Sequence, residues 1–207
     1  VFISKHSSEA GIHSLTVHPI GNVGEAKFGG KENKLVQAAP EEMTAALRTL
    51  WDETREQGLK GEYDVSFEAT HHGPYLETPT YYIEIGSDID SWKDERAGKV
   101  IAETVLEVKD RDKEDLPVTI CIGGGHYTPR FTSLAKGRKV ALGHIVPGWG
   151  MKYLTKESFA ETVKKTPGVE YVYFDRSSTS GKERNRVESW ASEFDIEVIR
   201  SKDLEKR

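Results

Sequence analysis

The stretch VTICIGGGH at residues 118–126 joins an uninterrupted apolar run to three glycines and a histidine. Five consecutive residues that include valine, threonine and isoleucine predict a strand buried on both faces, as in the parallel sheets of α/β proteins. The glycines and His126 mark the point where this strand ends. Because open α/β sheets bind ligands at the carboxyl ends of their strands, the stretch predicts both the fold class and the edge that carries the site.

Two other stretches repeat this pattern. VSFEATHHGP at residues 65–74 places His71 and His72 after a strand-like run, and KVALGHIVP at residues 139–147 places His144 beside a glycine. Three such strand ends predict one rim that carries imidazoles. That arrangement is more typical of an active site than of a folding requirement.

The rest of the chain alternates helices with strands from residue 40 onward. Apolar residues recur at spacings of three and four after Pro40, between residues 89 and 108, after Thr155 and between residues 180 and 194. Runs of β-branched and aromatic residues at 80–85, 169–174 and 196–199 predict further strands. We therefore expect one α/β domain over residues 1–207, with three α/β/α layers and a mostly parallel mixed sheet.

Composition narrows the class of protein. No apolar run approaches the ~20 residues that a membrane-spanning helix needs, and no signal peptide is visible. The single cysteine, Cys121, excludes disulfides within the chain. We expect a cytoplasmic monomer without a membrane partner. Because the chain begins at Val1 within a strand-like run, we also expect that an N-terminal segment is missing from it.

The net charge of −5 argues against a general nucleic-acid binder, because phosphate neutralisation favours a basic surface. A local basic patch remains compatible with this total. The candidates beside the glycine-rich blocks are Lys27, Lys31, Arg130 and Lys136, and the alternative group is Lys182, Arg184 and Arg186.

Glu68, His71 and His72 form the densest group of chemically active side chains. Adjacent residues of an extended segment point in opposite directions, so both imidazoles enter one site only if the chain turns irregularly before Gly73. Glu68 suits a metal ligand, a general base or the partner that orients an imidazole. The spacings match neither the His-Glu-x-x-His helix nor a cysteine-rich zinc site, so the metal signal from the residues alone is weak.

Residues 123–125 allow two interpretations: a cradle of backbone N–H groups for an anion, or a close approach of backbone segments at a strand end. They match neither a Walker loop nor a dinucleotide-binding loop. Covalent serine catalysis is disfavoured, because His6 stands beside Ser7 and Ser8 but the chain contains no Gly-x-Ser-x-Gly turn. Cys121, in a buried strand, is expected to be a core residue rather than a nucleophile.

Together these blocks resemble the archaeal and plant type of D-aminoacyl-tRNA deacylase. The resemblance covers nearly the whole chain in order, and the combination of blocks is highly specific. Two departures are the lack of the further N-terminal segment of family members and Lys5, where arginine is expected. The matching stretches are residues 4–8 (SKHSS), 21–26 (GNVGEA), 28–30 (FGG), 68–74 (EATHHGP), 83–87 (IEIGS), 92–103, 123–127 (GGGHY) with Pro129, and 143–145 (GHI).

The resemblance implies a zinc-dependent enzyme that hydrolyses the ester between a D-amino acid and tRNA, with a fold like those of peptidyl-tRNA hydrolases and nucleoside phosphorylases. We expect direct attack by an activated water rather than an acyl-enzyme. The expected catalytic residues are Glu68, His72 and His126; the substrate-binding residues are His71, Gly123, Gly124, Gly125, Lys27 and Arg130; the zinc ligands are His6, His72, His126 and His144.

Two other functions remain open at this point. A metal-dependent amidohydrolase of small substrates would use the same imidazole-lined rim, but its activity would be indifferent to tRNA. A non-catalytic tRNA-binding module would bind tRNA without turning it over.

Overall fold

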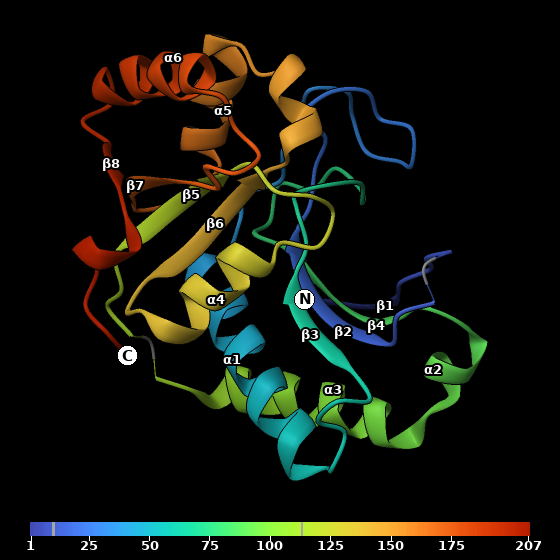
Figure 1. Ribbon diagram of the computed structural model, residues 1–207. Coiled ribbons are helices and arrows are strands. Elements are labelled where there is room, and N and C mark those ends of the chain that lie inside the picture. The colour runs from blue at the N-terminus through green and yellow to red at the C-terminus, as the bar shows by residue number, and fades with distance from the viewer. Residues whose placement is uncertain (10, 113) are drawn as a thin grey trace.

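The strands divide between two four-stranded sheets in the computed structural model, which describes residues 1–9, 11–112 and 114–207 (Figure 1). The first sheet has the order β1-β4-β2-β3, with β2 antiparallel to β4 and the other pairs parallel. The second has the order β6-β5-β7-β8 and is parallel throughout. The strands are β1 (Phe2–Lys5), β2 (Ser14–Pro19), β3 (Asp64–Phe67), β4 (Tyr81–Gly86), β5 (Val118–Ile122), β6 (Ala141–Val146), β7 (Val169–Phe174) and β8 (Glu197–Ile199).

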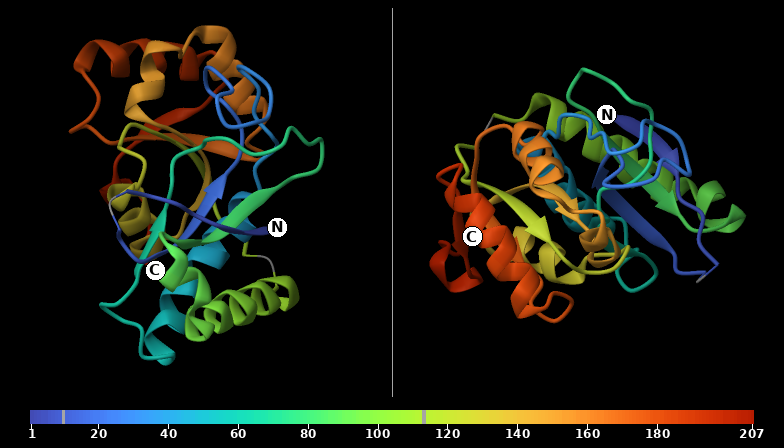
Figure 2. Two further views of the ribbon diagram at one scale, coloured as in Figure 1. Left: turned by 90° about the vertical axis from the view of Figure 1, so that its right-hand side faces the viewer. Right: turned by 90° about the horizontal axis from the view of Figure 1, so that it is seen from above.

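Helices cover both faces of the second sheet. On β5, Ile120 and Ile122 belong to the core beneath α5 and α6, whereas Cys121 belongs to the core shared with α1 and α4. In the left view of Figure 2, α5 and α6 lie above the strands and α1 and α3 lie below them. The expected α/β/α layering is thereby confirmed. The helices are α1 (Pro40–Glu56), α2 (Ile89–Lys93), α3 (Glu95–Asp110), α4 (Pro129–Gly137), α5 (Lys156–Lys164) and α6 (Gly181–Ser192), with short 3₁₀ turns η1 (Gly148–Lys152) and η2 (Ser201–Asp203).

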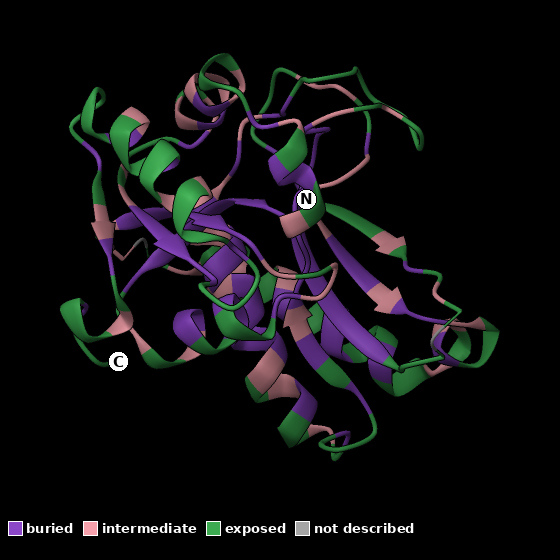
Figure 3. Cartoon of the chain, turned by 45° about the horizontal axis from the view of Figure 1, so that its top comes forward, coloured by how far each residue is buried: buried purple, intermediate pink, exposed green. Residues whose placement is uncertain are grey.

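The central strands of the first sheet, β2 and β4, have one apolar face and one polar face, and both faces are largely buried. Leu15, Val17 and Ile83 belong to the core that α1 and α3 cover. The alternate positions Thr16 and Glu84 are direct partners across β2 and β4, and they are as inaccessible to solvent as the apolar set. Figure 3 shows these strands as buried along most of their length. The polar face therefore lies inside the molecule, where each of its groups needs a partner.

The predicted elements are present, with three differences. The helix expected over residues 89–108 is divided at Asp94, whose carboxylate accepts a hydrogen bond from Arg96 N and starts α3 as a new helix. Helix α4 was not anticipated, and β6 continues through Gly143 to Val146, so His144 lies within a strand rather than at its end. None of the helices among the described residues has the length and apolar content needed to span a membrane.

One segment joins the two sheets. After Phe67 the chain leaves β3 and crosses to the second sheet, where Ala69 N donates to His126 O at 2.9 Å and Thr70 N donates to Ile145 O at 2.8 Å. On the other side, Glu68 N donates to Val17 O at 3.0 Å. Glu68 is therefore held by backbone hydrogen bonds at the junction of the two sheets.

Candidate active site

Glu68 is the centre of a group of imidazoles. Its side chain is completely buried, and its Oε2 lies 3.2 Å from His126 Nε2 and 3.5 Å from His71 Nε2. Its Oε1 lies 3.6 Å from His6 Nδ1. These three histidines come from the loop after β5, the crossing segment and the end of β1, so the carboxylate collects groups that are far apart in the sequence.

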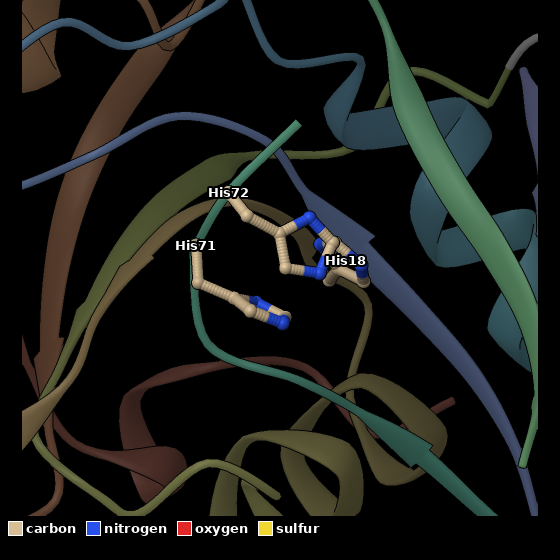
Figure 4. A group of neighbouring side chains, drawn as sticks. All are labelled: His18, His71 and His72. Atoms are coloured by element: carbon tan, nitrogen blue, oxygen red, sulfur yellow. The ribbon is translucent and has the colours of Figure 1, made fainter. Parts of the chain in front are cut away.

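His71 and His72 both reach this group because the chain turns between them. His72 has a φ of +28°, a backbone conformation that is rare for residues other than glycine. The ring centroids of the two histidines lie 4.1 Å apart, and that of His18 lies 4.3 Å from His71. Figure 4 shows the three side chains directed toward a common space. The condition set by the sequence, an irregular turn before Gly73, is met.

A second buried carboxylate, Glu84, lies on the far side of His18. Its Oε2 is 3.7 Å from His18 Nε2 and 3.7 Å from His6 Nδ1. Among the residues that the structure describes, three sets of side chains each present ligand atoms within 4.8 Å of one another: His18 with His71 and His72, His6 with Glu68 and His126, and His18 with Glu68 and Glu84.

The hydrogen bonds of two histidines orient their free nitrogens toward carboxylates. The contacts of His18 Nδ1 with Pro19 O (3.1 Å) and of His71 Nδ1 with Ala69 O (2.7 Å) require the proton on Nδ1, because a carbonyl only accepts. In the neutral ring, each Nε2 then directs a lone pair at Glu84 or Glu68. Two acceptors that face each other need a cation or a proton between them. Metal-binding histidines are oriented in this same way, by a backbone carbonyl on the other ring nitrogen.

The surroundings shift the pKa values of Glu68, His71 and His18 in different directions. Burial alone raises the pKa of Glu68, but contact with His126 and the charges of His18 and His6 outweigh burial and bring the pKa to about 2. Burial, with nearby His18 and His72, lowers the pKa of His71 to about 2. Burial also lowers the pKa of His18, but Glu84 and Glu68 outweigh it and the pKa is raised overall. Glu68 is therefore ionised and His71 neutral at physiological pH.

The His6 ring is positioned by three neighbours. Trp92 Nε1 donates to His6 O at 2.9 Å, and the Tyr127 hydroxyl lies 3.1 Å from His6 Nε2. A Cβ at Gly86 would lie 2.9 Å from the His6 ring and 2.5 Å from Ser14 Oγ, so only glycine leaves room for the imidazole. These contacts bring the end of β1 against the polar face of the first sheet.

His144 does not join this cluster, so we remove it from the expected ligand set. It is completely buried within β6, where Nε2 donates to Val36 O at 2.9 Å and Nδ1 lies 3.1 Å from Thr70 Oγ1. Both ring nitrogens are therefore occupied. Burial lowers the pKa of His144 to about 4, which keeps the ring neutral. Its role is to hold the crossing segment in place.

The three glycines do not form an anion cradle. Gly123 N donates to Val146 O at 2.8 Å and Gly124 N donates to Ser178 Oγ at 2.6 Å, while Gly125 is exposed. A Cβ at Gly123 would lie 2.6 Å from Ser178 Oγ, so this position needs glycine for close backbone approach. The other interpretation of the sequence is the correct one for these residues. Cys121 is buried in the core, and burial raises the pKa of its thiol.

The cluster opens into a cavity of about 1060 Å³. His6, His71, His72 and His126 line its inner end, and the glycine-rich loop of residues 21–30 and the η1 turn line its rim. Lys27 and Lys152 lie on this rim, and Lys31 covers the Tyr75 ring nearby. The other two candidates for the basic patch do not line this cavity. Arg130 pairs with Asp175 at 2.8 Å, and Lys136 covers the Trp51 ring.

Two residues of the cluster were missed by the sequence analysis. Glu84 belongs to the strand expected over residues 80–85 and His18 belongs to β2, but no glycine or turn marks them as site residues. The available signal was their position: Thr16 and His18 share one face of β2, and Tyr82 and Glu84 share one face of β4. Polar residues at alternate positions of two buried strands indicate a polar interior.

We expect His144→Leu to reduce stability without removing a metal ligand. Loss of the ring leaves the buried Val36 O without its partner and removes the contact with the Thr70 hydroxyl, which costs about 1–3 kcal/mol. Between the unfolded pKa of about 6.5 and the folded pKa of about 4, only the unfolded chain binds a proton here, so this residue weakens the wild-type fold as pH falls. Urea unfolding at pH 7.5 and pH 5 should therefore show a smaller wild-type advantage at pH 5. If His144→Leu kept the wild-type stability but lost metal uptake, His144 would be a metal ligand after all.

Known proteins resemble this chain over most of its length. The family model for D-aminoacyl-tRNA deacylase matches residues 1–199. A D-aminoacyl-tRNA deacylase of Methanococcoides burtonii is 37% identical over 99% of this chain, which spans 41% of that protein. One from Picrophilus torridus is 33% identical over 97% of this chain and 76% of its own length. A crystal structure described as a conserved protein of unknown function has a TM-score of 0.93 and 34% identity, covering 100% of this chain and 73% of its own. Since the match runs from β1 to the end of β8, the chain belongs to the D-aminoacyl-tRNA deacylase family.

Proposed function

We propose that this protein hydrolyses the ester that joins a D-amino acid to tRNA and releases the free amino acid and tRNA. Family membership supports the substrate class, and one observation supports the chemistry: an ionised, fully buried Glu68 with three imidazoles around it at the inner end of a large cavity. Because the substrate is charged tRNA, we expect the reaction to take place in the cytoplasm.

We propose zinc as the cofactor, since the donor set fits it. His18, His71 and His72 offer three imidazoles, the number of protein ligands that catalytic zinc sites use with one position left for water. His6, Glu68 and His126 form a neighbouring set. His18 Nε2, a member of the first set, is buried without a hydrogen-bond partner, as the donor atom of a metal ligand would be. Bound zinc would lower the pKa of a water molecule and polarise the ester carbonyl.

The side chains suit general-base hydrolysis. Glu68 is fully buried and does not line the cavity, so an attacking water does not reach it directly, and we revise its role to orienting and stabilising an imidazole. His126 is the imidazole in closest contact with it, and about a third of the His126 side chain remains exposed to the cavity. We propose that His126 takes the proton from the attacking water and returns it to the ribose oxygen that leaves. The new bond joins the water oxygen to the carbonyl carbon, and the bond to the ribose oxygen breaks.

A direct assay separates this function from its two rivals. The protein is incubated with D-tyrosyl-tRNA and with L-tyrosyl-tRNA, each with and without a chelator, and release of the amino acid is measured. We expect hydrolysis of the D-ester alone, lost with the chelator and restored by zinc. A metal-dependent amidohydrolase would cleave small amides and ignore both tRNAs, and a binding module would retain tRNA without turnover.

Glu68→Gln should lower kcat by about 10²–10⁴-fold, because the neutral amide no longer stabilises the imidazolium that forms on His126. Single-turnover hydrolysis of D-tyrosyl-tRNA measures the effect. Glu77→Gln is the control, since Glu77 is exposed on the loop that follows. Ser7→Ala should retain most of the activity, because water attacks directly. A covalent D-tyrosyl adduct on Ser7, detected by mass spectrometry, would contradict direct attack.

The lysines on the cavity rim are expected to bind the tRNA backbone. Lys27→Ala and Lys152→Ala should each weaken tRNA binding and reduce the slope of log K against log [salt] by about 1, because each removes one phosphate contact. Filter binding at several salt concentrations measures this slope. Arg130→Ala and Lys136→Ala are matched controls, since neither residue lines the cavity. Equal effects in all four variants would contradict a binding surface centred on the cavity.

A further inference from the structure

We propose that Trp149 is the stacking platform for the adenine base of the terminal nucleotide of tRNA. This inference rests on the proposed function, since it assigns one part of that substrate to one residue of the same cavity. Every aminoacyl-tRNA carries its amino acid on a terminal adenosine, so a site for the ester needs a place for the attached nucleoside.

Trp149 stands between the buried chemistry and the exposed rim. Its indole is 48% exposed and lines the cavity. It lies nearly parallel to the His126 ring, with an interplanar angle of 21° and 6.5 Å between ring centroids. His126 in turn contacts Glu68. A base stacked on Trp149 would therefore lie close to His126 and Glu68, the side chains that would act on the ester.

The turn that carries Trp149 is fixed to the body of the protein. Gly148 N donates to Gly124 O and Gly150 N donates to Pro147 O, both at 2.9 Å. Met151, two residues beyond the tryptophan, is buried in the core beneath α5 and α6. An exposed tryptophan on a short, anchored turn offers a flat surface whose orientation is already set, which is what a positioning residue requires.

The size of the cavity indicates a ligand larger than an amino acid. Pockets that hold whole drug-sized ligands measure about 300–1,000 Å³, and this cavity measures about 1060 Å³. The aminoacyl group must enter the inner end to reach the imidazoles, so the outer part remains for the nucleoside. Lys152, which follows Trp149 on the same turn, extends the surface outward with a positive charge suited to phosphate.

The alternative occupant of the indole is the side chain of the amino acid. Two observations favour the base. Trp149 is half exposed at the mouth of the cavity, whereas the aminoacyl end must lie against the buried cluster. The base is also the part that all substrates share, and aromatic stacking suits it because every base offers a flat π face.

Kinetics with two substrates test the assignment. Trp149→Leu keeps an apolar side chain but removes the π face, and Trp149→Phe keeps a smaller π face. We expect Trp149→Leu to raise KM by about 5- to 150-fold for D-tyrosyl-tRNA and equally for D-alanyl-tRNA, with kcat little changed, because ground-state binding is lost. Trp149→Phe should recover most of the affinity. An increase confined to D-tyrosyl-tRNA, equal losses in both variants, or an unchanged KM would overturn the proposal.

A binding experiment keeps this inference separate from the proposed function. Calorimetry compares adenosine 5′-monophosphate with ribose 5-phosphate, which has the same sugar and phosphate but no base. The wild type should bind the nucleotide more tightly, and the preference should disappear in Trp149→Leu and persist in Trp149→Phe. Equal binding of the two probes by the wild type would overturn the stacking role. Failure of the wild type to cleave D-aminoacyl-tRNA, with the preference intact, would instead reject the proposed reaction.

Discussion

The burial of an ionised carboxylate at the junction of two sheets is the constraint on which the rest of this structure depends. An isolated charge in that position would cost several kcal/mol. Glu68 avoids this cost because imidazoles from three separate segments surround it, and their contacts hold its pKa at about 2. Those segments are the end of β1, the crossing segment and the loop after β5. The need to satisfy one carboxylate therefore explains why these loops meet.

The same constraint explains the unusual division of the first sheet. A sheet with one helical layer usually directs its second face to solvent. Here the second face is buried, and Thr16, His18 and Glu84 replace the apolar residues that such burial normally selects. Buried polar groups need partners, and the segments that cover this face supply them only in part. The remaining unsatisfied atoms are concentrated around the carboxylates, where a ligand would complete them.

Sequence patterns predicted the parts of this architecture that depend on local periodicity. The apolar spacing after Pro40 identified α1, and the run at 118–122 identified β5, because both report burial directly. The separation into two sheets was not visible, since it depends on long-range hydrogen bonds of residues 67–70. The same limit applied to His144. A histidine beside a glycine resembles a site residue in sequence, and only the contacts with Val36 and Thr70 assign it to the core. His18 is the opposite case. It belongs to the site but was not predicted, because a position within a strand gives no local sign of function.

The proposed catalytic residues lie deeper in the protein than the residues proposed to bind tRNA. Glu68 is fully buried, His126 is partly exposed beside it, and Trp149 and Lys152 are exposed beyond. Around Glu68 water is excluded, which strengthens the interaction between the carboxylate and the imidazoles. At Lys152 the surface is exposed to solvent, where contacts with tRNA phosphates form readily. The groups that cost folding stability are also found mainly at the buried end of this arrangement. The positive φ of His72 and the unsatisfied carboxylates lie in the inner layer, where the surrounding cores hold them. Trp149 and Lys152 of the outer layer have neither a positive φ nor a buried unsatisfied atom, so substitutions there should cost little stability.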